Sequence, residues 1–265
     1  MEISTIDFKK SLGQNFLFDL NLLRAIVKDG DVGAEDTVLE IGAGAGTLTN
    51  ELCKVAKKVV SFEIDKSLKP HLDKVESENE NLTIIYADFM DFDLNNFNEK
   101  NARVVANIPY YITTPIIFKL IEHIEKFKSI LVLIQKEVAE RFSAKPNSKD
   151  YGITSVILQS VFDVSMPRVV KKECFTPSPK VDSALCKLVP NKKYEITNFE
   201  GFKNFVHQSF AMRRKTLINN LKNFYSKEDL LNVLTKYNYN PTVRSEQISV
   251  ESFVNIFHDL NNCTN

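Results

Sequence analysis

The sequence has little that would set it apart from ordinary globular proteins. Its 265 residues carry no net charge, with 34 Lys and Arg against 34 Asp and Glu. Its 8 Gly and 9 Pro are too few for a low-complexity linker protein. With 43% hydrophobic and 26% charged residues, disorder, collagen and a simple coiled coil are excluded for the chain as a whole. The length corresponds to one large domain, or to one large and one small domain.

Cysteines and long apolar runs are also scarce. Four cysteines lie far apart and form no CxxC pair: Cys53, Cys174, Cys186 and Cys263. This spacing predicts neither a disulfide framework nor a zinc site, and the four histidines show no metal-ligand spacing. The first residues lack an apolar core and are not Arg-rich, which argues against a signal or transit peptide. No apolar run approaches the roughly 18 residues of a membrane span, so we expect a cytoplasmic protein without metal or membrane.

The zero net charge hides an uneven distribution along the chain. Residues 166–227 hold 13 Lys and Arg but four Asp and Glu, whereas residues 75–99 hold seven acids and no basic residue. A basic region beside an acidic one is typical of a protein that holds a polyanion by one face. A solvated basic surface explains the charge equally well, so charge alone leaves both interpretations open.

Short β-branched runs alternate with helical patterns through the first 190 residues. Strands are predicted at residues 37–41, 58–64, 82–87, 102–107 and 129–134, with helices at 47–56, 67–77 and 114–126. This alternation predicts an α/β fold with a parallel sheet covered by helices. Two later strands, at residues 162–170 and 183–189, are expected to pair antiparallel.

The pattern changes after Pro190. A polar stretch is followed by four helical periods, at residues 202–210, 213–224, 227–237 and 250–260. We therefore place a domain boundary near residue 193, with an α/β domain over residues 1–193 and a small helical domain over residues 194–265.

A glycine-rich turn follows the strand predicted at residues 37–41. The strand runs into Glu40-Ile41-Gly42-Ala43-Gly44-Ala45-Gly46, and glycines allow positive φ and close approach of the backbone to a ligand. The next two strands end in acids. Glu63 can accept both ribose hydroxyls of an adenosine, and Asp88 can accept from the exocyclic amine. Either acid alone is explained as a solvated loop residue, but two at successive strand ends favour an adenosine site.

The composition of the turn discriminates between adenosine cofactors. The turn does not read GxGxxG, as in dinucleotide-binding folds, and the chain lacks the GK[ST] of a phosphate-binding loop. An ExGxGxG turn with an acid on the next strand resembles the cofactor loop of Rossmann-like methyltransferases that use S-adenosylmethionine. That cofactor has no pyrophosphate, which agrees with the absence of lysine from the turn.

The strand at residues 102–107 ends in Asn107-Ile108-Pro109-Tyr110, which resembles the [DN]PPY-type motif of methyltransferases acting on exocyclic amines. The lone pair of adenine N6 is delocalised into the ring, which makes the amine a poor nucleophile. Acceptors that bind its N–H groups draw the nitrogen toward tetrahedral geometry and free the lone pair. The Asn107 side-chain oxygen and the Ile108 carbonyl are candidate acceptors. Pro109 fixes φ and has no competing N–H, and Tyr110 offers a ring for base stacking. An isolated NxPY is otherwise a strand-ending turn with a core tyrosine.

Together the motifs resemble one family, the ribosomal RNA adenine N6,N6-dimethyltransferases, over nearly the whole chain. The segments that carry the resemblance are KKSLGQNFL (9–17), LEIGAGAGTLT (39–49), FEID (62–65), AD (87–88), NIPYYITTPII (107–117), FTPSPKVDSA (175–184), RRKTLINNL (213–221) and RSEQIS (244–249). The resemblance implies a Rossmann-like methyltransferase domain, a C-terminal helical RNA-binding domain and S-adenosylmethionine as methyl donor. One departure is Tyr111, where bacterial members often carry Asn; it bears on packing more than on chemistry.

The family has two branches, which differ in their RNA substrate. One dimethylates two adjacent adenines near the 3′ end of 16S rRNA while the 30S subunit matures. The other modifies 23S rRNA and confers macrolide-class resistance. TTPII, FTPSPKVDSA, RRKT and RSEQIS resemble the first branch, which implies a 30S precursor as the partner. The second branch, and an RNA-binding factor that has lost catalysis, are the alternatives; the intact NIPY, GAGAG and Glu63 argue against lost catalysis.

Carried over residue by residue, the resemblance also implies a set of functional side chains. Cofactor contacts are implied for Asn15, Leu17, Gly42, Gly44, Glu63, Asp88 and Asn107. Catalytic roles are implied for Asn107, Ile108, Pro109 and Tyr110, with Phe175 as a second stacking ring. Without the resemblance, SLGQNFL would be an arm packed on the sheet, and Phe175 a core residue.

The resemblance further implies phosphate contacts from Arg213, Arg214 and Lys215 on a C-terminal helix. The alternative is a solvated helix face. No exposed heptad or apolar stripe stands out in the sequence, so a monomer is expected.

Overall fold

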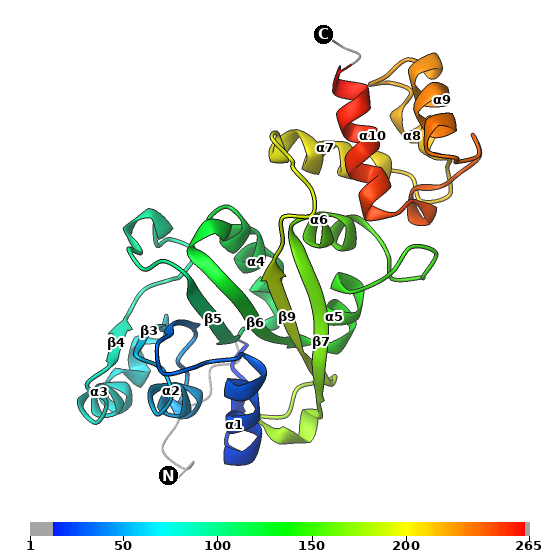
Figure 1. Ribbon diagram of the computed structural model, residues 1–265. Coiled ribbons are helices and arrows are strands. Elements are labelled where there is room, and N and C mark those ends of the chain that lie inside the picture. The colour runs from blue at the N-terminus through cyan, green and yellow to red at the C-terminus, as the bar shows by residue number, and fades with distance from the viewer. Residues whose placement is uncertain (1–12, 263–265) are drawn as a thin grey trace. The chain divides into compact units, whose positions relative to one another are not determined.

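The computed structural model describes residues 13–262 (Figure 1). Ser11 and Leu12 of the SLGQNFL segment, together with Cys263, lie outside the described residues. The chain forms two compact units. The sheet unit is Met1–Ala139 with Ser165–Pro190, and the helical unit is Glu140–Val164 with Asn191–Asn265. Residues 140–164 thus group with the C-terminal helices, whereas the boundary expected from the sequence, near residue 193, keeps them in the first domain. That domain boundary stays a prediction.

The sheet unit is built on a sheet of seven strands in the order β4-β3-β2-β5-β6-β9-β7. Its strands are β2 (Thr37–Ile41), β3 (Lys58–Phe62), β4 (Leu82–Ile85), β5 (Ala102–Asn107), β6 (Phe127–Gln135), β7 (Phe162–Val170) and β9 (Ser183–Pro190). From β4 to β6 all neighbours pair parallel, and β9 pairs antiparallel with β6. The predicted parallel sheet is confirmed, and β7 lies beside β9.

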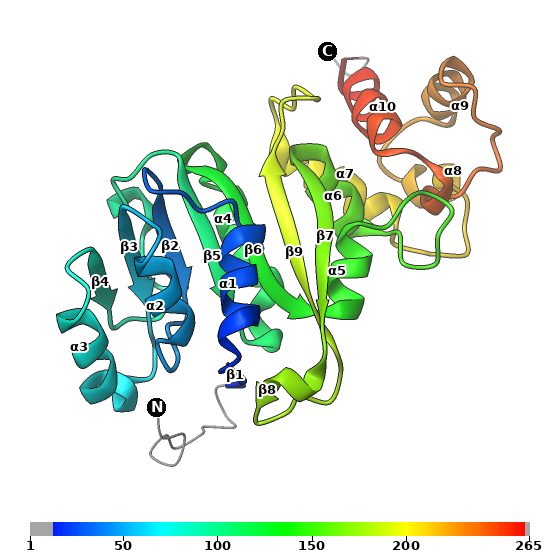
Figure 2. The same ribbon diagram turned by 60° about the horizontal axis from the view of Figure 1, so that its bottom comes forward.

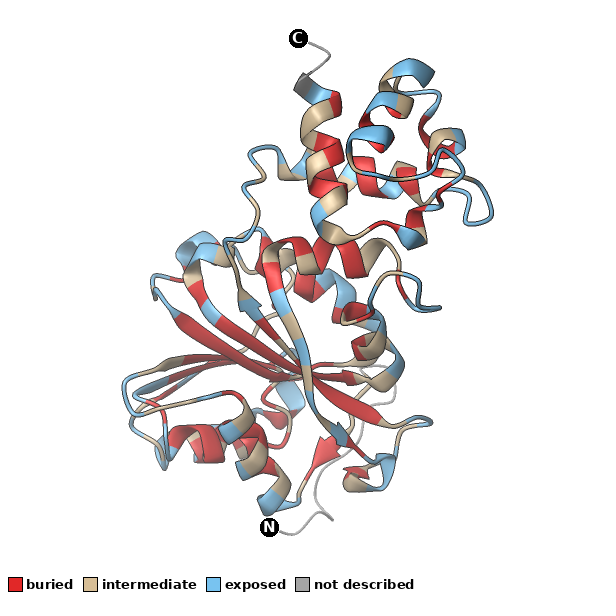
Figure 3. Ribbon diagram, turned by 45° about the vertical axis from the view of Figure 1, so that its right-hand side comes forward, coloured by how far each residue is buried: buried red, intermediate tan, exposed pale blue. Residues whose placement is uncertain are grey.

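Helices cover both faces of this sheet. They are α1 (Leu20–Asp29), α2 (Thr47–Cys53), α3 (Lys69–Ser77), α4 (Thr113–Ile121) and α5 (Lys136–Phe142). Figure 2 shows α1, α2 and α3 in front of the sheet and α4 behind it. The central strands are accordingly buried (Figure 3), and Val38, Leu39 and Val104 have no exposed surface. Sequence analysis missed α1, although Asp19 caps its first N–H groups.

A pair of short strands completes the sheet unit. β1 (Phe16–Leu17) pairs antiparallel with β8 (Phe175–Thr176), so that Leu17 lies opposite Phe175. Sequence analysis did not predict this pair, because two residues are too few to show an alternating pattern. The pairing holds the N-terminal segment against the sheet unit at a point 158 residues away along the chain.

The helical unit contains α6 (Ile153–Val161), α7 (Phe199–Ser209), α8 (Leu217–Leu221), α9 (Lys227–Lys236) and α10 (Val250–Asn262). Its core is aromatic: the ring of Phe205 lies 6.2 Å from that of Phe253 and 5.6 Å from that of Phe257. The helix predicted over residues 213–224 is wrong in extent. The Thr216 side chain accepts a hydrogen bond from the Asn219 N–H, which caps α8 so that the helix begins at Leu217.

The strand order reverses between β2 and β5. From β2 the chain proceeds outward through β3 and β4, and β5 then starts on the other side of β2. Ligands of open α/β sheets bind at such a switch point, outside the carboxyl ends of the strands. A ligand site is therefore expected at the ends of β2 and β5, where the glycine turn and NIPY follow.

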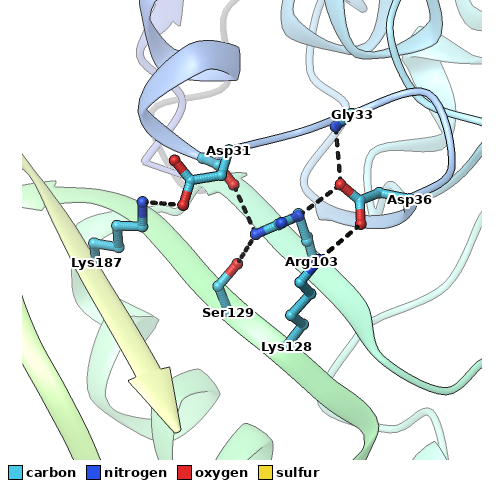
Figure 4. A network of polar contacts seen from close by, with 8 residues as sticks. Asp31, Gly33, Asp36, Arg103, Lys128, Ser129 and Lys187 are labelled. Carbon is cyan, nitrogen blue, oxygen red and sulfur yellow. Dashed lines mark hydrogen bonds and ion pairs between the residues drawn. The ribbon is translucent and has the colours of Figure 1, made fainter.

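The opposite, amino end of the sheet is held by a buried arginine (Figure 4). Arg103 on β5 donates to the Asp36 carboxylate at 2.7 Å, to the Ser129 hydroxyl at 2.9 Å and to the Gly30 carbonyl at 3.3 Å. The guanidinium thus bonds the connection between α1 and β2 to strand β6.

Further charged contacts surround Arg103. Asp36 also accepts from the Gly33 N–H at 2.8 Å, and Lys128 lies 3.7 Å from its other oxygen. Burial opposes ionisation of Asp36, but the hydrogen bonds from Arg103 and Gly33 outweigh it and lower the pKa of this carboxyl. Nearby, Lys187 on β9 pairs with Asp31 at 2.6 Å. These contacts join the loop before β2 to strands β5, β6 and β9.

Candidate active site

A pocket lies at the carboxyl ends of β2, β3 and β5. It is lined by residues 13–17, 23, 41–45, 47–48, 62–64, 87–89, 107–112 and 116. The lining includes every predicted cofactor-binding residue: Asn15, Leu17, Gly42, Gly44, Glu63, Asp88 and Asn107. It also includes Ile108, Pro109 and Tyr110. The structure brings these residues together, while their individual roles stay predictions.

The glycine turn forms the floor of this pocket, and its backbone favours glycine at two points. Gly42 and Gly44 have φ of 86° and 55°, values that glycine adopts without strain. A Cβ atom on Gly44 would lie 2.7 Å from a ring carbon of Phe16. The N–H groups of Gly42 and Ala43 both donate to the Phe62 carbonyl, at 2.8 and 3.0 Å. The turn is therefore anchored to the end of β3.

Glu63 follows β3 and is held in place by backbone donors. The Gly44 N–H donates to one carboxylate oxygen and the Asp65 N–H to the other, both at 2.7 Å. Burial raises the pKa of Glu63, although the N–H groups of Asp65, Gly44 and Ile64 oppose the shift. A carboxylate has about four acceptor positions, so the group keeps capacity for a ligand. A pair of vicinal hydroxyls fits this arrangement.

Glu40, at the end of β2, lies behind the turn rather than in the pocket. It has no exposed surface, and one oxygen accepts from the Thr49 and Ser61 hydroxyls at 2.6 and 2.7 Å. Its Oε1 atom has no partner among the described residues. Burial raises the pKa of Glu40 to about 7, and the nearby Glu63 contributes in the same direction. The first residue of the ExGxGxG motif thus ties β2 to α2 and β3.

Asp88 and Asn107 present acceptors on two further sides of the pocket. Asp88 accepts from the Met90 N–H at 2.8 Å through Oδ1, which leaves Oδ2 for a ligand. The Asn107 amide nitrogen donates to the Asn15 carbonyl at 2.9 Å. A carbonyl oxygen only accepts hydrogen bonds, so this contact determines which end of the Asn107 amide is nitrogen. The Asn107 oxygen is consequently the acceptor available to a substrate.

Residues after Asn107 form a short turn, η5 (Tyr110–Ile112). Ile108 is 1% exposed, and Pro109 carries no N–H that could compete for an acceptor. The hydroxyl groups of Tyr110 and Ser183 lie 2.6 Å apart. Burial raises the pKa of Tyr110, and the contact with Ser183 opposes the shift. Sequence analysis did not single out Ser183, although it lies in the quoted FTPSPKVDSA segment.

The N-terminal segment closes one side of the pocket. Gln14 donates to the Asp65 carboxylate at 2.9 Å, and the Thr47 hydroxyl donates to the Leu17 carbonyl at 2.7 Å. These bonds tie residues 13–17 to the end of β3 and to the start of α2. The described part of SLGQNFL is therefore both an arm packed on the sheet unit and a wall of the pocket.

Phe175 lies behind this wall. It is 3% exposed, belongs to the hydrophobic core and pairs with Leu17. It is not among the described residues that line the pocket, so in this structure its ring supports the lining rather than facing a base. A stacking role for Phe175 requires it to move and stays a prediction.

Arg213, Arg214 and Lys215 form a turn, not a helix. All three are exposed between α7 and α8, which corrects the expected helical position, because the cap at Thr216 starts α8 only after them. Arg213 donates to the Lys149 carbonyl at 2.7 Å. Within residues 13–262 no ion pair involves these three side chains. Other basic residues of the basic region are paired: Arg168 with Asp29, Lys171 with Asp182, Lys187 with Asp31, Lys193 with Asp163 and Lys203 with Glu200.

The described residues lack the features of a metal site and of a membrane span. Over residues 13–262, no cluster of three or more His, Cys, Asp or Glu is arranged to hold a metal ion. None of the helices in that range is both long enough and apolar enough to cross a membrane.

Comparison with known proteins decides the family. A family model described as ribosomal RNA adenine dimethylase matches residues 5–262. This chain belongs to the ribosomal RNA adenine dimethylase family. Members are methyltransferases, and the methyl donor is S-adenosylmethionine. The resemblance stated from the sequence motifs is therefore confirmed, as is the Rossmann-like methyltransferase fold.

Curated relatives of this dimethylase share nearly its full length. A ribosomal RNA small subunit methyltransferase A of Bacillus cereus is 44% identical over 96% of this chain and 91% of its own. A protein of the same name from Bacillus mycoides is 43% identical over the same shares.

Two solved structures of similar fold cover both units of this dimethylase. A dimethyladenosine transferase from Plasmodium falciparum has a TM-score of 0.83 and 29% identity, over 93% of this chain and 98% of that one. The 23S rRNA methyltransferase ErmE has a TM-score of 0.75 and 25% identity, over 93% of this chain and 100% of that one.

Proposed function

We propose that this dimethylase transfers methyl groups to N6 of two adjacent adenines near the 3′ end of 16S rRNA in a 30S subunit precursor. The observation that carries the chemistry is the Asn15–Asn107 hydrogen bond, which leaves the Asn107 oxygen as an acceptor at the pocket. The choice of the small subunit is supported by the curated relatives that bear that name at 43–44% identity.

The cofactor is assigned to the floor and one side of the pocket. Glu63 holds the ribose hydroxyls through the acceptor capacity that its backbone donors leave free. Asp88 accepts from the adenine amine of the cofactor through Oδ2. Gly42 and Gly44 let the backbone approach closely, and residues 15–17 cover the bound molecule. These acceptors fit an adenosine without phosphates, and S-adenosylmethionine supplies an already activated methyl group.

The target amine is assigned to the end of β5. In the first transfer to each adenine, the Asn107 oxygen and the Ile108 carbonyl accept from its two N–H groups, which draws the nitrogen toward tetrahedral geometry and frees its lone pair. In the second transfer one N–H remains, and one of these acceptors binds it. Tyr110 stacks on the base, and Ser183 fixes the orientation of the Tyr110 ring through its hydroxyl. With an activated methyl donor, catalysis rests mainly on orientation, a contribution that can reach about 7–11 kcal/mol.

The RNA backbone is assigned to the helical unit. Arg213, Arg214 and Lys215 are exposed, whereas several other basic residues of the basic region already have acidic partners. Unpaired cations are the groups that release counterions when they contact phosphates. We assign these three residues to phosphates of the RNA backbone, in a monomeric enzyme that works in the cytoplasm.

The substrate assignment is tested by mapping methylated nucleotides. In a strain deleted for the gene, primer extension stops at the two adenines of 16S rRNA are expected to be absent, and to return when the wild-type gene is supplied. A stop that disappears from 23S rRNA instead would identify the enzyme as a 23S rRNA methyltransferase, the activity that the name of ErmE states.

Catalysis itself is tested in vitro. Purified protein is incubated with tritiated S-adenosylmethionine and small-subunit particles from the deletion strain. Transfer of about four methyl groups per particle is expected from two dimethylated adenines. Binding without transfer would show an RNA-binding factor that has kept the fold without the reaction.

A further inference from the structure

One aromatic side chain at the pocket is exposed and has no role in the proposed reaction. Tyr111 lines the pocket, yet it is 63% exposed, the largest value among the exposed large hydrophobic residues of the described chain. Its neighbour Tyr110 is half-buried with its hydroxyl against Ser183. The two tyrosines of η5 thus differ: one is held inside the pocket and the other stands at its mouth.

One edge of the Tyr111 ring lies against Gly13. A Cβ atom on Gly13 would lie 3.3 Å from Cδ1 and 3.5 Å from Cε1 of Tyr111. The ring therefore packs against the backbone of the N-terminal segment, while most of its surface remains accessible. No hydrogen bond holds its hydroxyl to another of the described residues. A backed ring with an accessible face is a stacking platform rather than a core residue.

The proposed substrate supplies an occupant for this platform. When one of two adjacent adenines leaves its stack to enter the pocket, the neighbouring base loses a stacking partner. The neighbour is joined to the target by one phosphodiester, so it must lie at the mouth of the pocket. Aromatic side chains replace this stacking for any base, because every base has a π-face, with a strength that depends on the base. The chemistry expected at Tyr111 is thus that of a nucleobase face.

We propose that Tyr111 stacks on the nucleobase next to the target base while the target is in the pocket. This inference rests on the proposed function, because it needs an RNA substrate with a neighbouring base. Tyr111 is then a substrate-binding residue that keeps the strand open at the pocket, whereas Tyr110 grips the target itself.

The test is a cycle of protein and RNA substitutions. Small-subunit particles from the deletion strain carry either guanine or uracil at the second adenine of the pair. Guanine retains a purine face without an N6 amine, whereas uracil stacks weakly. Single-turnover methylation of the remaining adenine is measured for the wild type, Tyr111→Ala and Tyr111→Phe, with cofactor affinity measured by calorimetry in parallel.

The wild type is expected to methylate the guanine particle about tenfold faster than the uracil particle, because stacking is stronger on a purine. Tyr111→Ala should lose this preference, whereas Tyr111→Phe, which keeps the ring, should retain it. Cofactor affinity should be the same in all three proteins. If Tyr111→Ala slows both particles by one common factor, the neighbour does not contact the ring and the proposal is overturned.

Failure of the proposed function is distinguishable from failure of this inference. If wild-type enzyme leaves both adenines of particles with unaltered RNA unmethylated, the substrate assignment itself is wrong. If it methylates them but shows no coupling between Tyr111 and the neighbouring base, only the stacking role is wrong.

Discussion

The polar groups at the two ends of the sheet differ in how much of their hydrogen-bonding capacity is used within the protein. At the amino end, Arg103 donates hydrogen bonds to three acceptors. The Asp36 carboxylate accepts hydrogen bonds from Arg103 and Gly33 and forms an ion pair with Lys128. At the carboxyl end, Glu63, Asp88 and Asn107 each use part of their hydrogen-bonding capacity within the protein. Both sets are positioned by the backbone, but only the second retains acceptors that face a pocket.

This difference separates stability from function. A buried polar group with all its partners holds chain segments together, whereas one that is oriented by a few bonds and keeps an acceptor free can bind a ligand. Substitutions at the amino end should therefore change the free energy of unfolding, and those at the carboxyl end should change affinity or rate.

The largest effect is expected for Arg103→Ala. It leaves the Asp36 carboxylate, the Ser129 hydroxyl and the Gly30 carbonyl without their buried donor, and removing one partner of a buried ion pair costs roughly 3–5 kcal/mol. Urea titration of the purified protein measures the loss. The matched control is Lys128→Ala, which removes the exposed cation from the same Asp36 and should cost less than about 1 kcal/mol.

The same variant should alter the dependence of stability on pH. The folded protein lowers the pKa of Asp36, so the contribution of this carboxyl is present above its unfolded pKa and is lost as pH falls through its folded pKa. Wild type should lose part of its unfolding free energy in acid, and Arg103→Ala should lose less. A weaker cofactor affinity in folded Arg103→Ala than in wild type would contradict the separation of the two ends.

The second effect is on rate. Asn107→Ala removes an acceptor assigned to the reacting amine, and loss of one such preorganised group typically lowers a rate by about 10²–10³-fold. Single-turnover methylation of small-subunit particles measures the change, and particle binding should stay near wild type. The control is Asn81→Ala, whose side chain bonds the Cys53 and Ala56 carbonyls away from the pocket. Equal loss of binding and rate in Asn107→Ala would contradict its assignment to the amine.

The third effect is on cofactor affinity. Glu63→Ala removes a charged acceptor assigned to the ribose, a loss of roughly 1.5–3 kcal/mol, so the dissociation constant measured by calorimetry should rise about tenfold or more. Glu35→Ala, at an exposed acid of the sheet unit, is the control and should leave affinity unchanged.

Glu63 should also give cofactor binding a pH dependence. Because its folded pKa is raised, affinity should be full at high pH and should begin to fall, as pH decreases, earlier than an ordinary glutamate would cause. Glu63→Gln should bind weakly at every pH, without this decline. Wild-type affinity in Glu63→Ala would remove the carboxylate from the site.

The smallest effect per residue is expected at the exposed turn of the helical unit. Replacing Arg213, Arg214 and Lys215 by Ala should lower the salt slope of particle binding by about one for each phosphate that is no longer neutralised, with cofactor affinity unchanged. The control removes equal charge from ion-paired positions by replacing Arg168, Lys171 and Lys187 with Ala. If both triple variants change the slope equally, net charge rather than the turn determines binding.

Local pattern alone was sufficient to predict much of the fold. The strands at residues 37–41 and 102–107 coincide with β2 and β5, because apolar runs bounded by turn residues identify buried strands. The strand at residues 162–170 coincides with β7, which is only partly buried. Gly42, Gly44, Glu63, Asp88 and Asn107 lie in one pocket, because parallel strands bring their carboxyl ends to one edge of the sheet; Asn15 and Leu17 came from the family resemblance.

What the tertiary structure decided are the contacts between residues far apart in sequence. The bond from Asn107 to the carbonyl of Asn15 crosses 92 residues, and no local pattern indicates which end of the amide faces the substrate. Phe175 carries an aromatic ring of the kind that stacks on bases, but its pairing with Leu17 places it in the core. Periodicity reports which side of an element is apolar; which partner that side meets, and which polar atoms remain free there, depends on the packing of the whole chain.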